Sequence, residues 1–429
     1  MGMPVQNPDA PPYTPMIVTL PQAIDRARGN DPSIVAAGAD AKITMLDRSI
    51  SRAALLPNAV YHNQFLYTQG TGGSGTLLAG SSQTPAPIFI ANNAVHEYTS
   101  QAVVTETIGL KPIADVRLAD ATAARAAAEY EIARRGLVAT VAVLYYSLIA
   151  SEHKVAVAQR ASNEAAGFTD LTSKREAARE VAHADVVKAQ LQQQQRERDL
   201  ADAKLAAAKA RLELGVLLFP DPRTSYATEA TAPPAMPSRA DVEAQATAHN
   251  PELGSALAAV QMSDAEILGA RAAYLPDLVL NFNYGIDAIQ FATKGPNGVQ
   301  NLGYSASATV DIPVWDWLAT PHRVKQTEIR RDAARVALTA TQRHLIAALD
   351  EAYAEAAEAQ QQAASLELSA RTAAESLRLT KLRYTAGEAS ALEVVDAQTS
   401  LTAAENARED GVMRYETGLA NLQVLTGTL

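Results

Sequence analysis

The sequence predicts a mainly α-helical fold of long antiparallel helical hairpins, to which two β-hairpins are attached. Three observations lead to this prediction. Long alanine-rich stretches lack internal helix breakers, four segments of about ten residues alternate apolar with polar side chains, and the two halves of the chain repeat each other. Aromatic residues make up only 5% of the chain, which is typical of long helices and coiled coils.

Charge and composition exclude several classes of protein. The 429 residues include 37 Lys and Arg against 47 Asp and Glu, a formal net charge of −10, so no basic stripe is available for a nucleic-acid partner. Without cysteine there is no disulfide and no thiolate metal site, and the seven histidines lack the spacing of zinc ligands. No glycine-rich phosphate loop follows a strand. We therefore expect no enzyme, no metal and no cofactor.

Two constant offsets reveal the internal repeat. Leu56-Pro57 recurs as Leu275-Pro276, an offset of 219 in position (275 − 56). The stretch "REAAREVAHADVVKAQ" (175–190) aligns without gaps on "RYTAGEASALEVVDAQ" (383–398), an offset of 208 (383 − 175). The expected division is a first repeat over 1–218, a proline-rich linker over 219–237 and a second repeat over 238–429.

Caps and prolines set the predicted helix boundaries. Thr19 and Ser238 each precede a helix and have a capping-box partner three residues later. Pro57 ends a helix, because proline bars the residue before it from helical geometry. Thr320 and Pro321 are expected to cap and start a helix of roughly 65 unbroken residues, about 100 Å long. Helical hairpins are thus expected over about 113–218 and about 320–427.

One apolar run suggests a membrane helix. Residues 136–150, "GLVATVAVLYYSLIA", lie between charged residues. The run is about 15 residues long, short of the roughly 20 that span a bilayer. Its repeat counterpart, "HLIAALDEAYAEAAE", carries charges in its middle. The run is therefore interpreted as a buried helix face.

Strand-like alternation is clearest in "DLVLNFNYGID" (277–287) and "LGYSASATVDI" (302–312), which predict a hairpin over about 277–312. A weaker pair over about 58–108 encloses a Gly/Ser-rich loop from Gly70 to about Asn93. Each hairpin has one apolar and one small-polar face. The apolar side chains expected to face lipid are Leu278, Leu280, Phe282, Tyr284 and Tyr304.

Two interpretations of these strands remain open at this point. Their length and alternation suit tilted transmembrane strands, but a half-buried hairpin on a soluble domain shows the same pattern. Four strands cannot close a barrel, which takes about eight. If they span a membrane, several chains must pool their strands.

The segment "LRYTAGEASALEVVDAQTSL" (382–401) interrupts a helix with Gly387 and then places two acids, Glu393 and Asp396, on one helix face. From the residues alone, the two acids could belong to a solvated stripe, a metal half-site or the lining of a pore. The metal site is the weakest of the three, because no histidine is spaced to complete it.

In these features the chain resembles the TolC family of bacterial outer-membrane efflux channels, and the resemblance covers nearly the whole chain. The ordered landmarks are the Asn250-Pro251 and Leu275-Pro276 pairs, "DIPVWDW" (311–317), the 383–398 motif and "LANLQVLTG" (419–427). The resemblance implies a homotrimer in the outer membrane of a Gram-negative bacterium. Each chain would give four strands to a twelve-stranded barrel and long helices to a periplasmic tunnel. It also implies a passive exit duct that works with a periplasmic adaptor and an inner-membrane transporter.

The resemblance also implies roles for residues at the hairpin tips. Gly387 would turn the tip, and Glu393 and Asp396 would ring the periplasmic aperture and favour cations. Tyr384 and Asp185 match the family's tip latch. The latch arginine of the family is absent, because Ala389 stands at its position.

The first hairpin tip departs from the family pattern. Arg179 replaces the tip glycine, so we expect a less sharp turn there, at a cost on the order of 1 kcal/mol if positive φ is needed. The family docks its adaptor at these tips, which here carry Gly387, Arg179, Arg175 and Arg383.

A different class of protein is the rival prediction. A periplasmic coiled-coil adaptor or scaffold with a small soluble β-domain would share the helices and the repeat. The outer face of the four strands distinguishes the two, because a charge on that face would block membrane assembly but only perturb a soluble domain.

Overall fold

The computed structural model describes residues 16–67, 96–230, 235–295 and 298–429. These residues form two compact units. The first contains the described parts of 1–41, 126–255 and 338–429, and the second those of 42–125 and 256–337. The Gly/Ser-rich loop predicted from Gly70 to about Asn93 lies outside the described residues.

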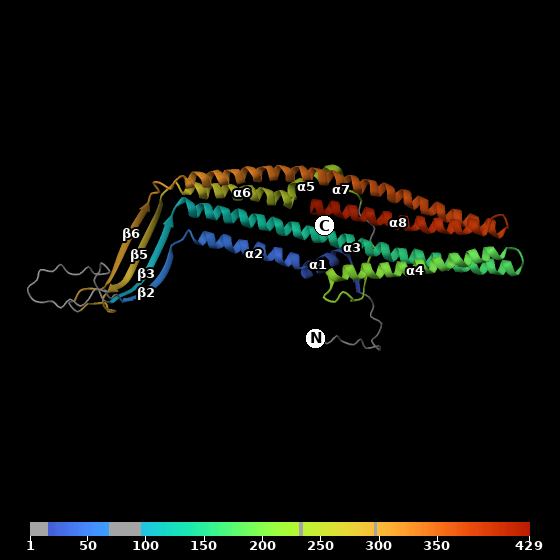
Figure 1. Cartoon of the computed structure of the whole chain (residues 1–429), viewed down its shortest axis with the longest axis horizontal. Helices are drawn as coiled ribbons and strands as arrows, with labels where there is room; N and C mark the ends of the chain where they lie inside the picture. The colour runs from blue at the N-terminus through green and yellow to red at the C-terminus, as the bar shows by residue number, and fades with distance from the viewer. Residues whose placement is uncertain (1–15, 68–95, 231–234, 296–297) are drawn as a thin grey trace, which may run out of the picture. The chain divides into compact units, whose positions relative to one another are not determined.

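The first unit is helical apart from one short strand pair. Helix α4 (His183–Leu218) follows α3 (Leu110–Ala177), and α8 (Ala391–Thr426) follows α7 (Ala319–Thr385). Figure 1 shows that α3 and α4 run antiparallel and meet at a tip, as do α7 and α8. Two short helices, α1 (Leu20–Asn30) and α5 (Arg239–His249), also belong to this unit. The first part of α3 (110–125) and of α7 (319–337) is assigned to the second unit.

The helices repeat with the two offsets found in the sequence. α1 and α5 have 11 residues each, and α2 (Pro32–Ala53) and α6 (Pro251–Ala272) have 22 residues each. In both pairs the starting positions differ by 219 (239 − 20 and 251 − 32). α4 and α8 have 36 residues each, and their starting positions differ by 208 (391 − 183). The division of the chain at 218 and 238 stays a prediction.

Two of the predicted helix caps are confirmed and one is wrong. Thr19 forms a capping box with Gln22, and the Ser238 side chain accepts the N–H of Asp241. The α7 helix already begins at Ala319, so Thr320 lies inside its first turn. There the carboxylate of Asp316 accepts the Thr320 N–H at 2.7 Å. Thr320 was predicted as the cap because proline follows it, but the side chain that accepts the hydrogen bond at this helix start is Asp316, four residues earlier.

One face of the apolar run 136–150 is buried, as predicted. Val141, Tyr145 and Leu148 are at most 1% exposed and belong to the largest cluster of buried side chains in the first unit. Within the described residues, one helix, α3, has a window long and apolar enough to cross a membrane by length and composition, and 39% of that window is buried. The burial of these side chains against neighbouring elements explains their apolar character without a membrane.

A short parallel strand pair was not predicted. Strand β1 (Met16–Val18) pairs with β4 (Tyr226–Thr228), which lies between the two repeats. The Tyr145 hydroxyl lies 3.0 Å from the Val18 carbonyl oxygen and 2.9 Å from that of Glu229, so it ties both segments to α3. Strands of three residues show no alternation that a sequence pattern could reveal.

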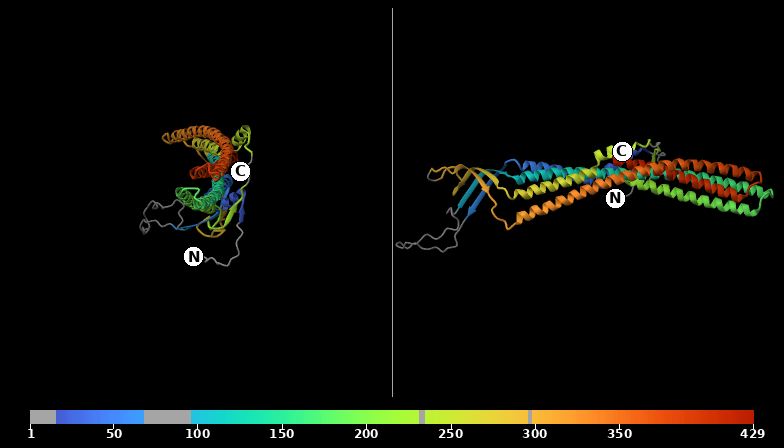
Figure 2. Two further views of the ribbon diagram at one scale, coloured as in Figure 1. Left: turned by 90° about the vertical axis from the view of Figure 1, so that its right-hand side faces the viewer. Right: turned by 90° about the horizontal axis from the view of Figure 1, so that it is seen from above.

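The second unit contains one four-stranded antiparallel sheet. Its strands are β2 (Asn58–Tyr67), β3 (His96–Ile108), β5 (Asp277–Ala288) and β6 (Leu302–Asp311), in the order β2-β3-β5-β6. The strands lie side by side in Figures 1 and 2. Both predicted hairpins are present in their described parts, and the β3–β5 pair joins them into one sheet.

Register gives the sheet two different faces. Tyr284 lies opposite Tyr304, and the rings of Phe282 and Tyr304 stack with centroids 6.3 Å apart. The alternating positions form the other face, where Asn281 lies opposite Ser307 and accepts a 2.8 Å hydrogen bond from Thr105. The five side chains predicted to face lipid therefore share one face, Leu278, Leu280, Phe282, Tyr284 and Tyr304.

Candidate functional site

The two hairpin tips of the first unit share one turn geometry. In the first tip the N–H groups of Arg179 and Glu180 donate to the carbonyl oxygens of Glu176 and Arg175, at 2.7 and 2.9 Å. The same two bonds recur at the repeat counterparts in the second tip. Such paired bonds, with a left-handed residue between them, end a helix sharply.

The expectation of a less sharp first turn is wrong. Arg179 adopts a φ of 62°, close to the 81° of Gly387 at the same place in the second tip. The backbone hydrogen bonds hold Arg179 in the left-handed region although it has a Cβ. The cost is on the order of 1 kcal/mol.

The helices that follow the two tips begin differently. Ser390 caps α8 and accepts the Glu393 N–H, while the Glu393 carboxylate accepts the Ser390 N–H at 3.0 Å. Ala182, at the same position of the first tip, provides no side-chain cap. The pattern Ser-x-x-Glu before a helix was visible in the sequence and was missed.

The two acids assigned to the aperture have different surroundings. Hydrogen bonds from the backbone and side chain of Ser390 lower the pKa of Glu393, with a smaller contribution from Arg383 at 3.4 Å. Asp396 is exposed one turn further on, and its carboxylate has no hydrogen bond or ion pair with the described residues. Their place at an aperture stays a prediction.

Tyr384 is a buried contact between the two hairpins. It is 3% exposed, its ring packs against Phe168 with centroids 5.2 Å apart, and its hydroxyl lies 3.3 Å from the Thr172 hydroxyl. Within the described residues, Asp185 lies in the first turn of α4 and makes no hydrogen bond to Tyr384. The role of Asp185 in a latch stays a prediction.

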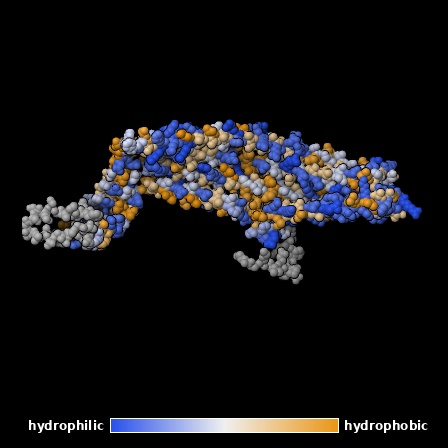
Figure 3. All heavy atoms as spheres, viewed as in Figure 1, coloured by the Kyte–Doolittle hydropathy of each residue, from blue (hydrophilic) through white to orange (hydrophobic). Residues whose placement is uncertain are grey.

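The arginine at each tip has its own set of partners. Arg175 donates from Nη1 to the Tyr384 carbonyl oxygen at 2.5 Å, and its guanidinium carbon lies 4.9 Å from the centre of the Tyr384 ring. Arg383 instead donates to the Glu388 carbonyl oxygen of its own tip, at 3.1 Å. Figure 3 shows that hydrophilic residues dominate the visible surface of the tips.

A row of ion pairs joins α3 of the first hairpin to α8 of the second. Arg160 lies 3.1 Å from Glu405, and Lys154 lies 2.5 Å from Asp410. Next to Asp410 on α8, a carboxylate oxygen of the buried Glu409 lies 2.8 Å from Nδ1 of His153. Sequence analysis could not find these pairs, because their members lie more than 240 positions apart and match no local spacing.

Glu416, on the same helix as Glu409, is buried beside two tyrosines, Tyr145 and Tyr146. Burial raises the pKa of Glu416 to about 7; His153 acts against this rise, and the charge of Glu409 adds to it. Glu409 itself is held below its ordinary pKa, because hydrogen bonds from Arg408 and His153 outweigh its burial. This helix thus carries one acid that is readily protonated near neutral pH and one that is not.

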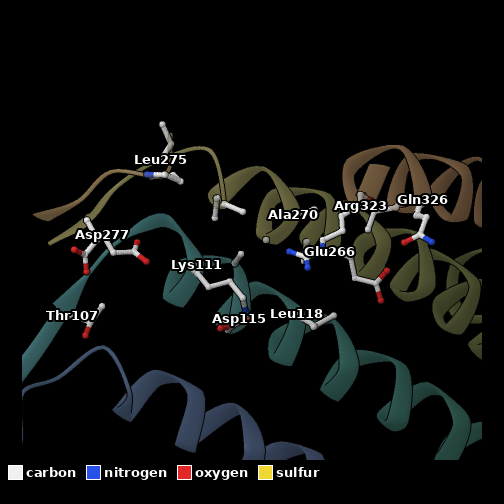
Figure 4. A pocket seen from close by; sticks show the side chains of 18 of the residues that line it. Thr107, Lys111, Asp115, Leu118, Glu266, Ala270, Leu275, Asp277, Arg323 and Gln326 are labelled. Carbon is white, nitrogen blue, oxygen red and sulfur yellow. The ribbon is translucent and has the colours of Figure 1, made fainter. Parts of the chain in front are cut away.

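In the second unit a recess of about 920 Å³ opens on the polar face of the sheet. Figure 4 shows side chains of α3, α6 and α7 around it, with Asp277 at the strand end. Asp277 lies directly opposite Asp311 in the β5–β6 register. The Asp277 carboxylate occupies the place of a side chain at Gly109, where an added Cβ would lie 1.9 Å from its oxygen. A side chain at position 109 would therefore require the Asp277 carboxylate to turn away.

The turn after β6 exposes both tryptophans of the chain. Trp315 and Trp317 lie edge to face with ring centroids 5.9 Å apart, and both are exposed. Trp317 and Leu318 adopt positive φ values of 56° and 65°. The two exposed rings thus form an apolar patch on this turn.

Residues 243–428 match the family model described as "Outer membrane efflux protein". The outer membrane protein OprJ of Pseudomonas aeruginosa is 26% identical over 172 residues, which are 40% of this chain and 36% of that relative. The match thus spans about a third of the relative's length.

The fold matches solved structures over nearly the whole chain. The CmeC outer membrane channel of Campylobacter jejuni has a TM-score of 0.79 and 16% identity, with 95% of this chain and 85% of that chain covered. A membrane protein from Pseudomonas aeruginosa has a TM-score of 0.80 and 19% identity, with 99% and 97% covered. Residues 243–428 therefore resemble the outer membrane efflux protein family in sequence, and nearly the whole chain shares the fold of these solved structures.

Proposed function

We propose that the chain forms a homotrimeric exit duct in the outer membrane of a Gram-negative bacterium. The observation that carries the proposal is the four-stranded sheet, which has one apolar and one polar face and leaves β2 and β6 each paired on one side only within the described residues. Three such sheets, joined edge to edge, make a closed barrel of twelve strands.

The two faces of the sheet fit the two environments of a barrel wall. Phe282, Tyr284 and Tyr304 meet lipid, while Asn281 and Asn283 line a water-filled interior. The recess beside Asp277 and Asp311 opens on the polar face and so belongs to this interior. The interior is then a passive, acidic path for small molecules or proteins.

The helical hairpins continue the duct into the periplasm. Their tips carry Arg175, Arg179, Arg383 and Gly387 and are where a periplasmic adaptor docks, together with an inner-membrane transporter that supplies the energy. Glu393 and Asp396 ring the aperture. Tyr384 and Asp185 hold it closed, so Tyr384→Phe combined with Asp185→Ala raises the conductance of the resting channel.

A lysine scan across the two faces tests the duct. Phe282→Lys puts a charge in lipid, which costs roughly 2 to 4 kcal/mol near the bilayer midplane, and is expected to abolish trimers in the outer membrane. Asn283→Lys, the next residue on the opposite face, is the matched control and is expected to assemble. The measurement is the yield of trimer extracted from outer membranes. Equal yields of the two variants, or a monodisperse trimer without detergent, would favour a soluble scaffold instead.

A further inference from the structure

The arginines at the two tips are repeat counterparts, yet only one of them reaches the other hairpin. The side chain of Arg175 is 17% exposed and holds Tyr384 of the second hairpin. The side chain of Arg383 is 55% exposed and bonds only to its own tip, through Glu388 and Glu393. A guanidinium has five N–H donors, so Arg383 retains donors for a further partner.

The repeat identifies the residue that would stand opposite Arg383. In a ring of identical chains, first and second hairpins alternate, so each second hairpin has the first hairpin of the next chain as its neighbour. The counterpart of Tyr384 in the first hairpin is Glu176 (384 − 208 = 176). Its carboxylate lies near the tip surface, 2.7 Å from Nδ1 of His183.

Resting on the homotrimer proposed above, we infer that Arg383 of one copy contacts Glu176 of the next copy, at the place where Arg175 contacts Tyr384 inside one copy. Opposite charges favour the contact, and a guanidinium binds a carboxylate through two parallel hydrogen bonds. The groups that already face the pair are Glu393 beside Arg383 and His183 beside Glu176. Both groups leave room for a further contact, because the Glu393 side chain is 47% exposed and the His183 side chain is 77% exposed.

Several other contacts that join the two hairpins of one copy have no counterpart between copies. Inside a copy, Phe168 packs on Tyr384, Arg196 donates to the Thr399 hydroxyl at 2.9 Å, and Lys381 lies 3.3 Å from Glu164. The repeat counterparts of these residues cannot form the same contacts. The counterparts are Ser376 for Phe168, Ala404 for Arg196, Leu191 for Thr399 and Ser173 for Lys381. The Arg383–Glu176 pair therefore carries a larger share of the contact between copies than Arg175 carries within one.

Cysteine cross-linking tests the contact directly, because the chain has no cysteine of its own. The variant Arg383→Cys with Glu176→Cys, assembled in lipid nanodiscs, is treated with a short bismaleimide. We expect denaturing gels to show species of two and three chains. The matched control, Arg175→Cys with Tyr384→Cys, joins a chain to itself and keeps the mass of one chain. Each single-cysteine variant is expected to stay monomeric on the gel.

The possible results separate the contact from the proposed function. Native mass spectrometry of the unmodified protein reports the trimer. Suppose that the protein is a trimer and that the control variant reacts. If the Arg383→Cys, Glu176→Cys variant then gives no linked chains, the inferred contact is wrong, and the proposed duct is unaffected. If no trimer forms, the duct itself is overturned. As a second measurement, Arg383→Glu is expected to raise the resting conductance, and adding Glu176→Arg is expected to restore it. A double variant as conductive as the single one contradicts the pair.

Discussion

The guanidinium of Arg175 lies over the ring of Tyr384 and donates to the carbonyl oxygen of the same residue, so one side chain of the first hairpin holds both the ring and the backbone of the second. This double contact needs a planar donor with several N–H groups. It joins two residues that lie far apart in the sequence, one in each repeat.

Replacing Arg175 by Lys is expected to loosen the two tips. Lysine keeps the charge but loses the flat stacking surface, which costs about 0.5 to 2 kcal/mol. Faster proteolysis at the tips and a higher resting conductance would both report the change. The control is Arg378→Lys, whose guanidinium pairs with Glu375 on an exposed helix face and is expected to have little effect. Equal behaviour of the two variants would contradict the role of Arg175.

The first tip is expected to gain stability from Arg179→Gly. Glycine adopts the φ of 62° without steric cost, so the free energy of unfolding rises by about 1 kcal/mol. The reciprocal change, Gly387→Ala, is expected to lower it by a similar amount. Thermal unfolding of the detergent-solubilised protein measures both. A stabilising Gly387→Ala would show that positive φ is not required.

The caps of α4 and α8 make a second reciprocal pair. Ser390→Ala removes the capping box of α8 and is expected to lower stability by about 1 kcal/mol. Ala182→Ser places a cap at the same position before α4, where none exists, and is expected to raise it. Melting temperatures and proteolysis at the tips check the two changes. If neither variant differs from the parent, the caps contribute nothing in the assembled protein.

Glu416 is expected to make stability fall as the pH rises. Its pKa is about 7 in the folded protein and about 4.5 in the unfolded chain, so the folded state binds more protons between these values. The stabilising contribution is complete below about pH 4.5 and is lost on passing pH 7. Glu416→Gln removes this dependence and is expected to stabilise the protein above pH 7.

Glu409 gives the opposite control for this titration. Its pKa is lowered in the folded protein, so its contribution is lost as the pH falls below the ordinary range of glutamate. Glu409→Gln is therefore expected to destabilise the protein at neutral pH. Unfolding curves collected between pH 4 and 8 measure both variants; identical pH profiles of Glu416→Gln and the parent would refute the assignment.

The aperture acids are expected to contribute unequally to ion selectivity. The carboxylate of Glu393 is engaged by Ser390 and Arg383, whereas that of Asp396 is exposed. Asp396→Asn is therefore expected to lower cation selectivity more than Glu393→Gln does. The reversal potential in a planar bilayer under a salt gradient measures it, and Asp170→Asn, whose carboxylate pairs with Lys174 on the exposed side of α3, is the charge-matched control. Unchanged selectivity in the Glu393→Ala, Asp396→Ala double variant would rule out both residues.

Much of the fold could be predicted because its signals are local. Pro32 and Pro251 mark the starts of matched helices, and the alternation around Phe282 marks a strand, whatever the rest of the chain does. The constant offsets then align the two repeats. Resemblance to a known family supplied the trimer and the aperture, which no local signal contains.

The details of the tips could not be predicted, because they depend on contacts between distant segments. Nothing near Tyr384 in the sequence indicates that its hydroxyl meets Thr172 or that Arg175 covers its ring. Glu393 is a different case. Its capping box with Ser390 has a local sequence signal, Ser-x-x-Glu, so this structural role could have been predicted beside the role of its charge.

The strand pair β1–β4 has a consequence for the order in which the chain becomes structured. Met16 and Tyr226 are register partners, although their positions differ by 210 (226 − 16). Bringing two strands this far apart in the sequence together closes a long loop, which is slow, whereas the α3–α4 hairpin between them forms from contacts nearer in the sequence. The buried Val18 and Tyr226 therefore close the first repeat last, after its long helices already exist.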